Sequence, residues 1–274
     1  MRLLARLLGL GLAAALLLAG WGYWGATRTP QVIRQSVQLK GLPPGTRLRV
    51  LLFSDTHFGR PDMPAARLDA IVDQANALKP DLILLAGDYN GGKLVPLSGT
   101  PHLEPAVAPF ARLKAPLGVF AVLGNHDTMK WTPVVFARQK SPRLLVDDSV
   151  DIGPMVIAGI NSVQHGADLA GTLARIPAAT KPILVFRHEG DWMTYAPPPS
   201  GRAALALAGH THGGQILFPL LGSPGDLLLG GTACRRGLCR LNGWPLYVTS
   251  GVGTSWLPMR IGVPPELVLL TLHP

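Results

Sequence analysis

The sequence has few cysteines, few charges and few aromatic side chains. Only Cys234 and Cys239 are present among 274 residues, which excludes a cysteine-rich scaffold and a zinc site built from thiolates. Charged residues make up 15%, and the basic ones are scattered and not interleaved with aromatics. The net charge of +9 therefore favours an anionic substrate or an anionic lipid surface, and we expect no nucleic-acid partner. The two cysteines form a small disulfide loop in an oxidising compartment, or stay inert thiols in a reducing one.

One long apolar run stands near the N-terminus. Residues 7–26 are nearly all Leu, Ala and Gly, and roughly 20 apolar residues are enough to span a bilayer. Trp21, Tyr23 and Trp24 lie where an interfacial aromatic belt would be. A cleaved signal peptide is the alternative, but no small-x-small cleavage site follows the run. We therefore predict a single-pass anchor, whose orientation stays open because basic residues flank both ends.

The rest of the chain reads as one domain, because it has no internal repeat and no linker long enough to divide it. Residues 1–28 are the predicted anchor, 29–47 a linker with a first strand, and 48–274 the catalytic domain. The apolar runs are continuous and do not alternate, which predicts strands covered on both faces and hence an α/β sandwich. Helices are expected over 68–78 and near 104–113. The expected strands are 32–39, 48–53, 82–86, 119–123, 155–160, 183–186, 205–208, 246–249 and 267–272.

Five of these apolar runs end in a polar cluster. In layered α/β folds the functional groups gather at strand ends, where the loops of neighbouring strands converge, so we expect one shared site. The clusters begin at Asp55, Asp88, Asn125, His188 and His210.

The clusters supply oxygen and imidazole ligands without any thiolate. Such a set suits Mn(II), Fe or Zn better than Ca(II), which prefers all-oxygen cages. Seven candidates are too many for one tetrahedral ion, and they suit two ions roughly 3.5–4 Å apart, bridged by a carboxylate and a hydroxide. Next to them, His126 can donate a proton and Asp127 can orient its ring. The seven candidate ligands are Asp55, His57, Asp88, Asn125, His188, His210 and His212.

In order and spacing, these motifs resemble the calcineurin-like metallophosphoesterase superfamily over about residues 48–272. The resemblance implies two mixed β-sheets flanked by helices, here behind a transmembrane helix. Residues 213–215 and the tail motifs at 250–255, 258–260 and 264–266 resemble a narrower group. That group is the membrane-anchored bacterial branch that includes YaeI-type phosphodiesterases and a UDP-2,3-diacylglucosamine pyrophosphatase.

The resemblance also implies a role for each residue. Asp88 would bridge two metals, His126 would protonate the leaving oxygen or grip the phosphate, and Asp127 would orient His126. The remaining ligands of the first and second metal would be, in turn, Asp55, His57 and His212, and Asn125, His188 and His210.

The sequence thus predicts a phosphoesterase anchored in the bacterial cytoplasmic membrane, with two divalent ions, of which Mn(II) is expected first. We expect it to cleave a phosphodiester or pyrophosphate bond, with a lipid-linked substrate such as UDP-2,3-diacylglucosamine as a candidate. The alternatives are a broad phosphomonoesterase and a non-catalytic metal-binding membrane protein.

Overall fold

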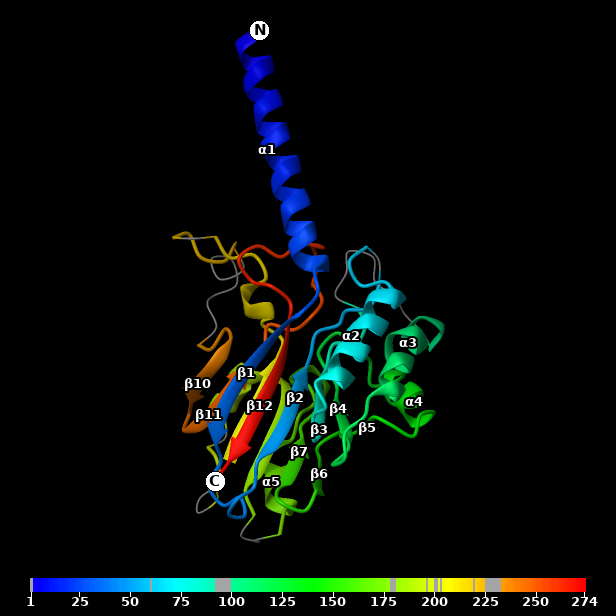
Figure 1. The fold of residues 1–274 in the computed structure, drawn as a ribbon, viewed down its shortest axis with the longest axis vertical. Coiled ribbons are helices and arrows are strands. Elements are labelled where there is room, and N and C mark those ends of the chain that lie inside the picture. Colours follow the sequence, from blue (N-terminus) through cyan, green and yellow to red (C-terminus); the bar gives the residue numbers. More distant parts are fainter. Residues whose placement is uncertain are drawn as a thin grey trace.

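The chain folds as two six-stranded mixed β-sheets packed face to face, as seen in a computed structural model (Figure 1). The α/β sandwich predicted from the sequence is confirmed. The structure describes residues 2–59, 61–91, 100–177, 181–195, 197–199, 202, 204–218, 220–224 and 233–274.

The first sheet has the order β1-β12-β2-β3-β4-β5. β12 runs parallel to β1 and antiparallel to β2, while β2, β3, β4 and β5 are mutually parallel. The carboxyl ends of β2, β3 and β4 therefore share one edge, and the C-terminus lies at the opposite one (Figure 1). The strands are β1 (Gln31–Gln38), β2 (Leu48–Phe53), β3 (Leu82–Ala86), β4 (Val119–Val122), β5 (Arg143–Leu144) and β12 (Glu266–His273).

The second sheet has the order β10-β11-β9-β8-β7-β6. Its four inner strands, β11, β9, β8 and β7, are parallel, and antiparallel strands close both sides. The strands are β6 (Asp148–Asp151), β7 (Val156–Gly159), β8 (Ile183–Glu189), β9 (Ala204–Gly209), β10 (Gly237–Leu241) and β11 (Trp244–Val248).

Three apolar layers hold the sandwich together. Side chains such as Leu84 and Leu184 meet between the two sheets, because successive residues of a strand point to opposite faces. The outer face of the first sheet packs against α2, α3 and α4, and that of the second against α5. The helices are α1 (Arg2–Thr27), α2 (Ala65–Ala77), α3 (Thr100–Val107), α4 (Thr132–Ala137) and α5 (Leu169–Arg175), with 3₁₀ turns at Ala108–Arg112, Val163–His165, Gly190–Tyr195 and His212–Gly214.

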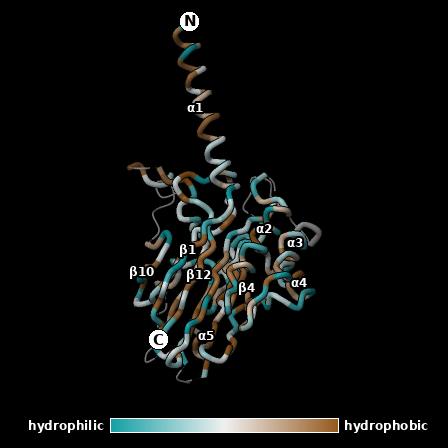
Figure 2. The backbone as a smooth tube through the Cα atoms, viewed as in Figure 1, coloured by the Kyte–Doolittle hydropathy of each residue, from teal (hydrophilic) through white to brown (hydrophobic). Residues whose placement is uncertain are grey.

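Helix α1 stands out from the edge where β2 ends, and Figure 2 shows its apolar character. It is long and apolar enough to cross a membrane. Its last turn is tied to the sandwich by Arg67 of α2, whose guanidinium donates to the carbonyls of Ala26 (2.8 Å), Thr27 and Arg28 (3.3 Å each). The base of α1 thus has a fixed place beside the strand ends.

The expected strands are present, with ends that differ by at most three residues. The β1 segment, assigned above to a linker region, pairs with β12 along its whole length and so belongs to the first sheet. Three strands were not predicted: β5 has two residues, and β6 and β10 are partly exposed outer strands without an apolar run. β8 continues to Glu189, so the predicted strand end before His188 is wrong, and His188 lies inside the strand.

Candidate metal centre

The predicted site residues lie at the carboxyl ends of five strands. These strands are β2, β3 and β4 of the first sheet and β8 and β9 of the second, and each set is parallel. Their ends meet at the edge from which α1 projects (Figure 1). Contacts across this edge, described below, join Asp55, His57, Asp88, His126, Asp127, His188, His210 and His212, and Asn125 lies between them in the chain.

Asp55, His57 and His212 form one buried cluster. The Nε2 atoms of His57 and His212 are 3.1 Å apart, and His212 Nε2 lies 3.4 Å from Asp55 Oδ1. Two imidazole nitrogens and a carboxylate oxygen that converge in this way can surround one cation.

Asp88, His188 and His210 form the neighbouring cluster. His188 Nε2 is 3.1 Å from Asp88 Oδ2 and 3.2 Å from His210 Nδ1. The same Asp88 oxygen lies 3.4 Å from Nε2 of His57, so it faces both clusters. Asp88 is thus the side chain through which the two clusters join.

The amide oxygen of Asn125 is a buried hydrogen-bond acceptor at this edge. Asn125 Oδ1 is buried and has no hydrogen-bond partner among the described residues. A buried acceptor without a partner is costly unless a further group satisfies it, and a cation is a group that an amide oxygen binds. With the two clusters, this oxygen fits a binuclear metal centre.

Backbone carbonyls hold two of the imidazoles in place. Nδ1 of His57 lies 3.0 Å from the carbonyl oxygen of Gly91, and Nδ1 of His188 lies 2.7 Å from that of Ala86. A carbonyl oxygen only accepts, so Nδ1 must carry the proton and Nε2 presents its lone pair to the cluster. Both rings are thereby set in the tautomer that a ligand needs.

Five of the predicted residues have a backbone that L-residues seldom adopt. Their φ angles are positive, between 41° and 74°, at Asp55, His57, Asp88, His210 and His212. Such angles are uncommon outside glycine, although Asp and His tolerate them better than most residues. Strained backbone gathers at functional sites because the surroundings must hold it, and here it turns successive side chains toward one point.

The glycines of the motifs allow the strand ends to approach one another. A Cβ on Gly124 would lie 2.0 Å from Oδ1 of Asp88, and one on Gly209 would lie 1.9 Å from Oγ of Ser54. Neither position has room for a side chain, so both glycines are required for packing and not for flexibility.

The electrostatics of the site hold Asp88 ionised and His210 and His212 neutral, and they keep a second proton on His188. Burial raises the pKa of Asp88, but the charge and the hydrogen bond of His188 outweigh burial and hold it well below its usual value. Burial lowers the pKa of His188, but Asp88 raises it further, to about 10. Burial and the field of His188 lower the pKa of His210 to about 4, and burial, followed by His57 and Arg260, lowers that of His212. An ionised Asp88 and neutral His210 and His212 are metal-binding forms, whereas His188 becomes a ligand on losing its second ring proton, and Asp55, whose pKa burial raises, on ionising.

His126 lies at the open side of the two clusters. Its backbone N–H donates to Asp88 Oδ1 (2.9 Å), and its half-buried ring lies 5.3 Å from that of His57, centroid to centroid. The ring is therefore close to the clusters without belonging to either.

The orienting role expected for Asp127 stays a prediction, and the hydrogen bonds of its carboxylate point to the backbone. Its buried carboxylate accepts from the backbone N–H groups of Gly124 (2.8 Å), Asp88 (2.9 Å) and Tyr89 (3.0 Å). Burial, and then the charge of Asp88, raise its pKa to about 7, so it is a weak source of the fixed negative charge that an orienting partner supplies. Asp127 joins the ends of β3 and β4, and it contacts no atom of the His126 ring in the described hydrogen bonds.

Two residues outside the predicted set support the site. His165, half-buried, places Nε2 2.9 Å from the carbonyl oxygen of Asp127. Arg260 is buried, and its guanidinium donates to the carbonyls of Ser250 (2.6 Å) and Gly253 (2.8 Å) and lies 3.4 Å from Nδ1 of His212. The sequence signal for Arg260 was its place within the tail motifs, whereas nothing in the sequence marked His165.

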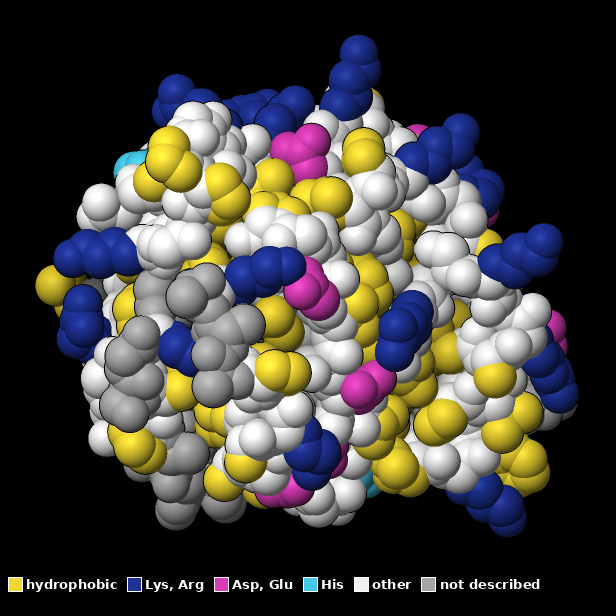
Figure 3. All heavy atoms as spheres, turned by 90° about the horizontal axis from the view of Figure 1, so that it is seen from below, with side chains coloured by type: hydrophobic (Ala, Val, Ile, Leu, Met, Phe, Trp, Pro, Cys, Tyr) yellow, Lys and Arg dark blue, Asp and Glu magenta, His cyan; other side chains and the backbone are white. Residues whose placement is uncertain are grey.

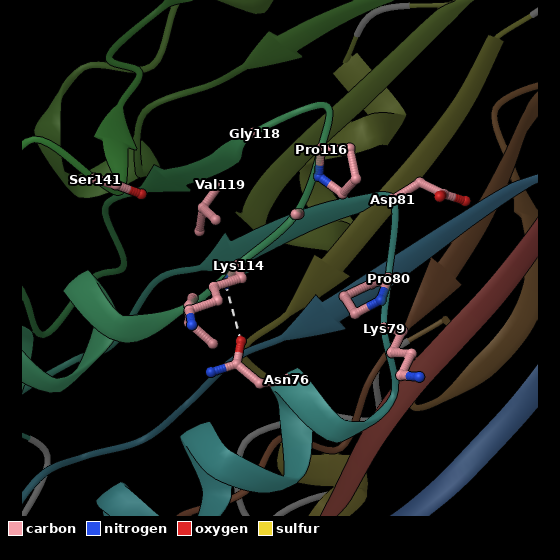
Figure 4. Close-up of a pocket in the computed structure, with 11 residues that line it drawn as sticks. Asn76, Lys79, Pro80, Asp81, Lys114, Pro116, Gly118, Val119 and Ser141 are labelled. Atoms are coloured by element: carbon pink, nitrogen blue, oxygen red, sulfur yellow. Dashed lines mark hydrogen bonds between the residues drawn. The ribbon is translucent and has the colours of Figure 1, made fainter.

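A hollow of about 760 Å³ lies elsewhere, at the amino ends of β3 and β4 (Figure 4). Lys79, Asp81 and Lys114 are among its lining residues, and none of the predicted site residues is. It opens at the opposite edge of the first sheet and is separate from the candidate centre.

Cys234 and Cys239 form a disulfide, which decides between the two alternatives left open by the sequence. The bridge closes a short loop that carries Arg235, whose carbonyl accepts from Thr211 Oγ1 (2.5 Å). The loop is thereby attached to the segment between His210 and His212.

Comparison with known proteins agrees with this geometry. The chain is 29% identical over 264 residues to an uncharacterized metallophosphoesterase of Aquifex aeolicus (strain VF5), covering 88% of this chain and 91% of that protein. It is 29% identical to the uncharacterized metallophosphoesterase YkuE of Bacillus subtilis (strain 168), covering 95% and 93%. A Danio rerio transmembrane protein with metallophosphoesterase domain is 28% identical, and the match covers 96% of this chain but only 62% of that longer protein.

These names do not support the narrower branch suggested by the tail motifs, because they go no further than metallophosphoesterase. Together with α1, the transmembrane relative suggests a single-pass membrane protein. The family model for calcineurin-like phosphoesterases matches residues 48–214. All seven predicted metal ligands lie within this range. The chain belongs to the calcineurin-like phosphoesterase family and is a hydrolase of phosphoric esters.

Proposed function

We propose that the protein is a membrane-anchored phosphoesterase that holds two divalent cations and hydrolyses a phosphodiester or pyrophosphate bond. The observation that carries this proposal is the position of Asp88 Oδ2, 3.1 Å from Nε2 of His188 and 3.4 Å from Nε2 of His57. One carboxylate oxygen that faces two clusters is what a bridging ligand requires. Bound cations would offset charge on the phosphoryl group and lower the pKa of a water molecule.

The ligands divide between the clusters as their contacts suggest. The thiolate-free donor set favours Mn(II), with Fe and Zn as the alternatives. Around the shared Asp88, one cation would be held by Asp55, His57 and His212, and the other by Asn125, His188 and His210.

His126 is the proposed proton donor to the leaving oxygen. Its ring lies beside His57 at the open side of the site, while its backbone N–H is fixed on Asp88. A half-exposed imidazole can exchange protons with solvent between turnovers, as a general acid must. Asp127 supports this arrangement indirectly, because its carboxylate holds the backbone that carries His126.

The disulfide supports a placement of the domain on the oxidising side of the membrane. Disulfides persist outside the cytosol and are rare within it, so Cys234–Cys239 favours the outer face of a bacterial cytoplasmic membrane. A site tethered there meets lipid-linked phosphoesters at high effective concentration. UDP-2,3-diacylglucosamine, the candidate named from the sequence, requires the cytoplasmic side and is therefore the second choice.

The full-length protein in detergent micelles tests the reaction class. We expect hydrolysis of bis-p-nitrophenyl phosphate to exceed that of p-nitrophenyl phosphate, to stop with a chelator and to return best with Mn(II). Asp88→Ala should lose both cations and turnover, while Asp148→Ala, at an exposed ion pair on β6, should keep both. Preference for the monoester would make the protein a phosphomonoesterase, and full activity after chelation would contradict the proposal.

A further inference from the structure

Two loops at the catalytic edge end in exposed apolar side chains. One turn carries Leu220, fully exposed, and Leu221, 72% exposed; the other loop carries Trp256, 67% exposed, and Leu257. Figures 1 and 2 place both loops at the end of the sandwich from which α1 projects. We call these four residues the apolar rim.

The backbone turns two of these side chains outward under strain. Leu220 has a φ of 69° and Trp256 a φ of 61°, in the left-handed region that bulky residues rarely occupy. Such a conformation persists only where the rest of the structure imposes it. Large apolar residues in strained, exposed turns gain nothing in water, so their position points to a partner outside the sandwich.

The loop of Trp256 is joined to the base of α1. The N–H of Arg260 donates to the carbonyl of Gly22 in α1 (2.8 Å), and a Cβ on Gly25 would lie 2.2 Å from the carbonyl oxygen of Arg260. A Cβ on Gly22 would likewise lie 2.7 Å from Met259. Two helix glycines thus let this loop pack directly against α1, whose position fixes the height of the loop relative to the membrane.

The two rim loops are also joined to each other. Gln215 donates through Nε2 to the carbonyls of Ser255 (3.0 Å) and Leu257 (3.1 Å), and its Oε1 accepts from the N–H of Ser255 (2.7 Å). The N–H of Leu217 donates to the carbonyl of Ile261 (2.8 Å). The rim is therefore one connected surface that includes the base of α1.

The same loops begin at the candidate metal centre. The Leu220 turn continues from the segment of His210 and His212, and the Trp256 loop begins at Gly253, where a Cβ would lie 2.2 Å from the carbonyl oxygen of Thr56. The two rim loops are thus continuous in the chain with segments that form the site.

The far end of the molecule differs in character. Figure 3 shows Lys and Arg side chains spread over the end opposite α1. Part of the net positive charge therefore lies at the end that faces away from the rim. Two exposed side chains of α1, Trp21 and Trp24, continue the apolar rim along the helix. Cζ of Arg28 lies 5.4 Å from the centroid of the Trp24 ring.

We infer that the apolar rim inserts into the lipid surface around α1, so that the catalytic edge faces the bilayer and acts on phosphoesters embedded in it. This inference rests on the proposed membrane-anchored phosphoesterase function. Its partner is the boundary between headgroups and acyl chains, where indole and leucine side chains are favoured. The rim would let the phosphate of a lipid reach the site while its chains stay in the bilayer.

The test uses full-length protein reconstituted in phosphatidylcholine vesicles and two substrates with one reaction centre. Ethyl p-nitrophenyl phosphate is soluble, and hexadecyl p-nitrophenyl phosphate is held in the bilayer. Because the leaving group and the scissile bond are the same, any difference between them reports access and not chemistry.

The rim variants are Leu220→Ser with Leu221→Ser, and Trp256→Ser with Leu257→Ser. The control is Val134→Ser, an exposed apolar residue on α4. We expect each rim pair to lower kcat/KM for the hexadecyl diester about tenfold, since two large apolar side chains leave the lipid. The ethyl diester should be hydrolysed as by the wild type, and the control should change neither rate.

A second measurement tests insertion of the rim into lipid independently of catalysis. Brominated phosphatidylcholine should quench part of the tryptophan fluorescence of the wild type. The quenched part should be smaller in Trp256→Phe. If rim variants cleave both diesters like the wild type and Trp256→Phe leaves the quenching unchanged, the rim does not contact lipid and the inference is overturned. Altered lipid hydrolysis without quenching at Trp256 would show that the rim acts on the reaction without contact with lipid, and it would overturn the inference as well. Failure to cleave either diester with Mn(II) present would instead refute the proposed function.

Discussion

Replacing Asp127 by alanine separates a structural role from a catalytic one. In the structure its carboxylate accepts three backbone N–H groups, from Gly124, Asp88 and Tyr89, and all three belong to the turns that end β3 and β4. Asp127→Ala leaves these donors buried and unpaired. We therefore expect the variant to lose stability and metal together, because Asp88 and Asn125 sit on the turns that come apart.

The magnitude follows from the number of donors. An unpaired buried donor costs about 1–3 kcal/mol, and three in one network, which do not add fully, should cost about 3–6 kcal/mol. Domains are commonly stable by about 5–15 kcal/mol, so Asp127→Ala removes a large fraction of that stability. Asp127→Asn is the milder variant, because its amide oxygen can still accept while its NH₂ opposes one donor; we expect a loss of about 1–3 kcal/mol.

The assay is urea unfolding in chelator, followed by tryptophan fluorescence, with metal content measured separately by mass spectrometry. Asp148→Ala removes a carboxylate from an exposed pair with Arg143 and should change stability by less than about 1 kcal/mol. Our reasoning is refuted if Asp127→Ala unfolds like the wild type, keeps both metals and loses only kcat. That outcome would support the orienting role.

Three further predictions concern other parts of the molecule. His126→Ala should keep its metal but lower kcat about 10²–10⁴-fold, with a smaller loss for p-nitrophenol than for an alkoxide leaving group; equal losses would leave the ring a positioning role only. Deletion of residues 1–28 should give a soluble, metal-binding domain. Deletion of residues 1–20 should give a domain whose free energy of unfolding in urea is about 1–3 kcal/mol higher, because Arg67 keeps its carbonyl acceptors. Equal midpoints of the two domains would show that this contact contributes nothing. Cys234→Ser opens a short loop and should lower the free energy of unfolding by about 2 kcal/mol, as dithiothreitol should in the wild type, and no change in either would argue against the disulfide.

The buried strands could be predicted from the sequence because their environment is uniform. β3 is buried along its whole length and β2 from Val50 onward, so both read as apolar runs, and both were predicted with the bounds that the structure has. β6 and β10 could not be found in this way, because a strand pairs through its backbone and a half-exposed outer strand needs no apolar pattern. The end of β8 was misplaced for a related reason: Arg187 and His188 are polar yet buried, and pairing with β9 carries the strand past them.

The identities of the candidate ligands were readable from the sequence, whereas the second layer around them was not. A motif shows that Asp127 follows His126, but not that its carboxylate turns away toward the N–H groups of Asp88 and Tyr89. That direction depends on how β3 and β4 meet, which is a property of the sheet. The same holds for His165, which reaches the site only because the second sheet packs on the first.

The position of β12 bears on how the protein is made. The last strand of the chain lies in the interior of the first sheet, between β1 and β2, and pairs with both. During synthesis α1, β1 and β2 leave the ribosome well before β12, the strand that must separate β1 from β2. Until β12 has emerged, β1 and β2 therefore each expose a strand edge whose backbone groups are unpaired, and these edges are open to chaperones or to aggregation. Deletion of Glu266–His273 would remove a strand from inside the sheet and leave β1, which follows α1, without the neighbour that it pairs with.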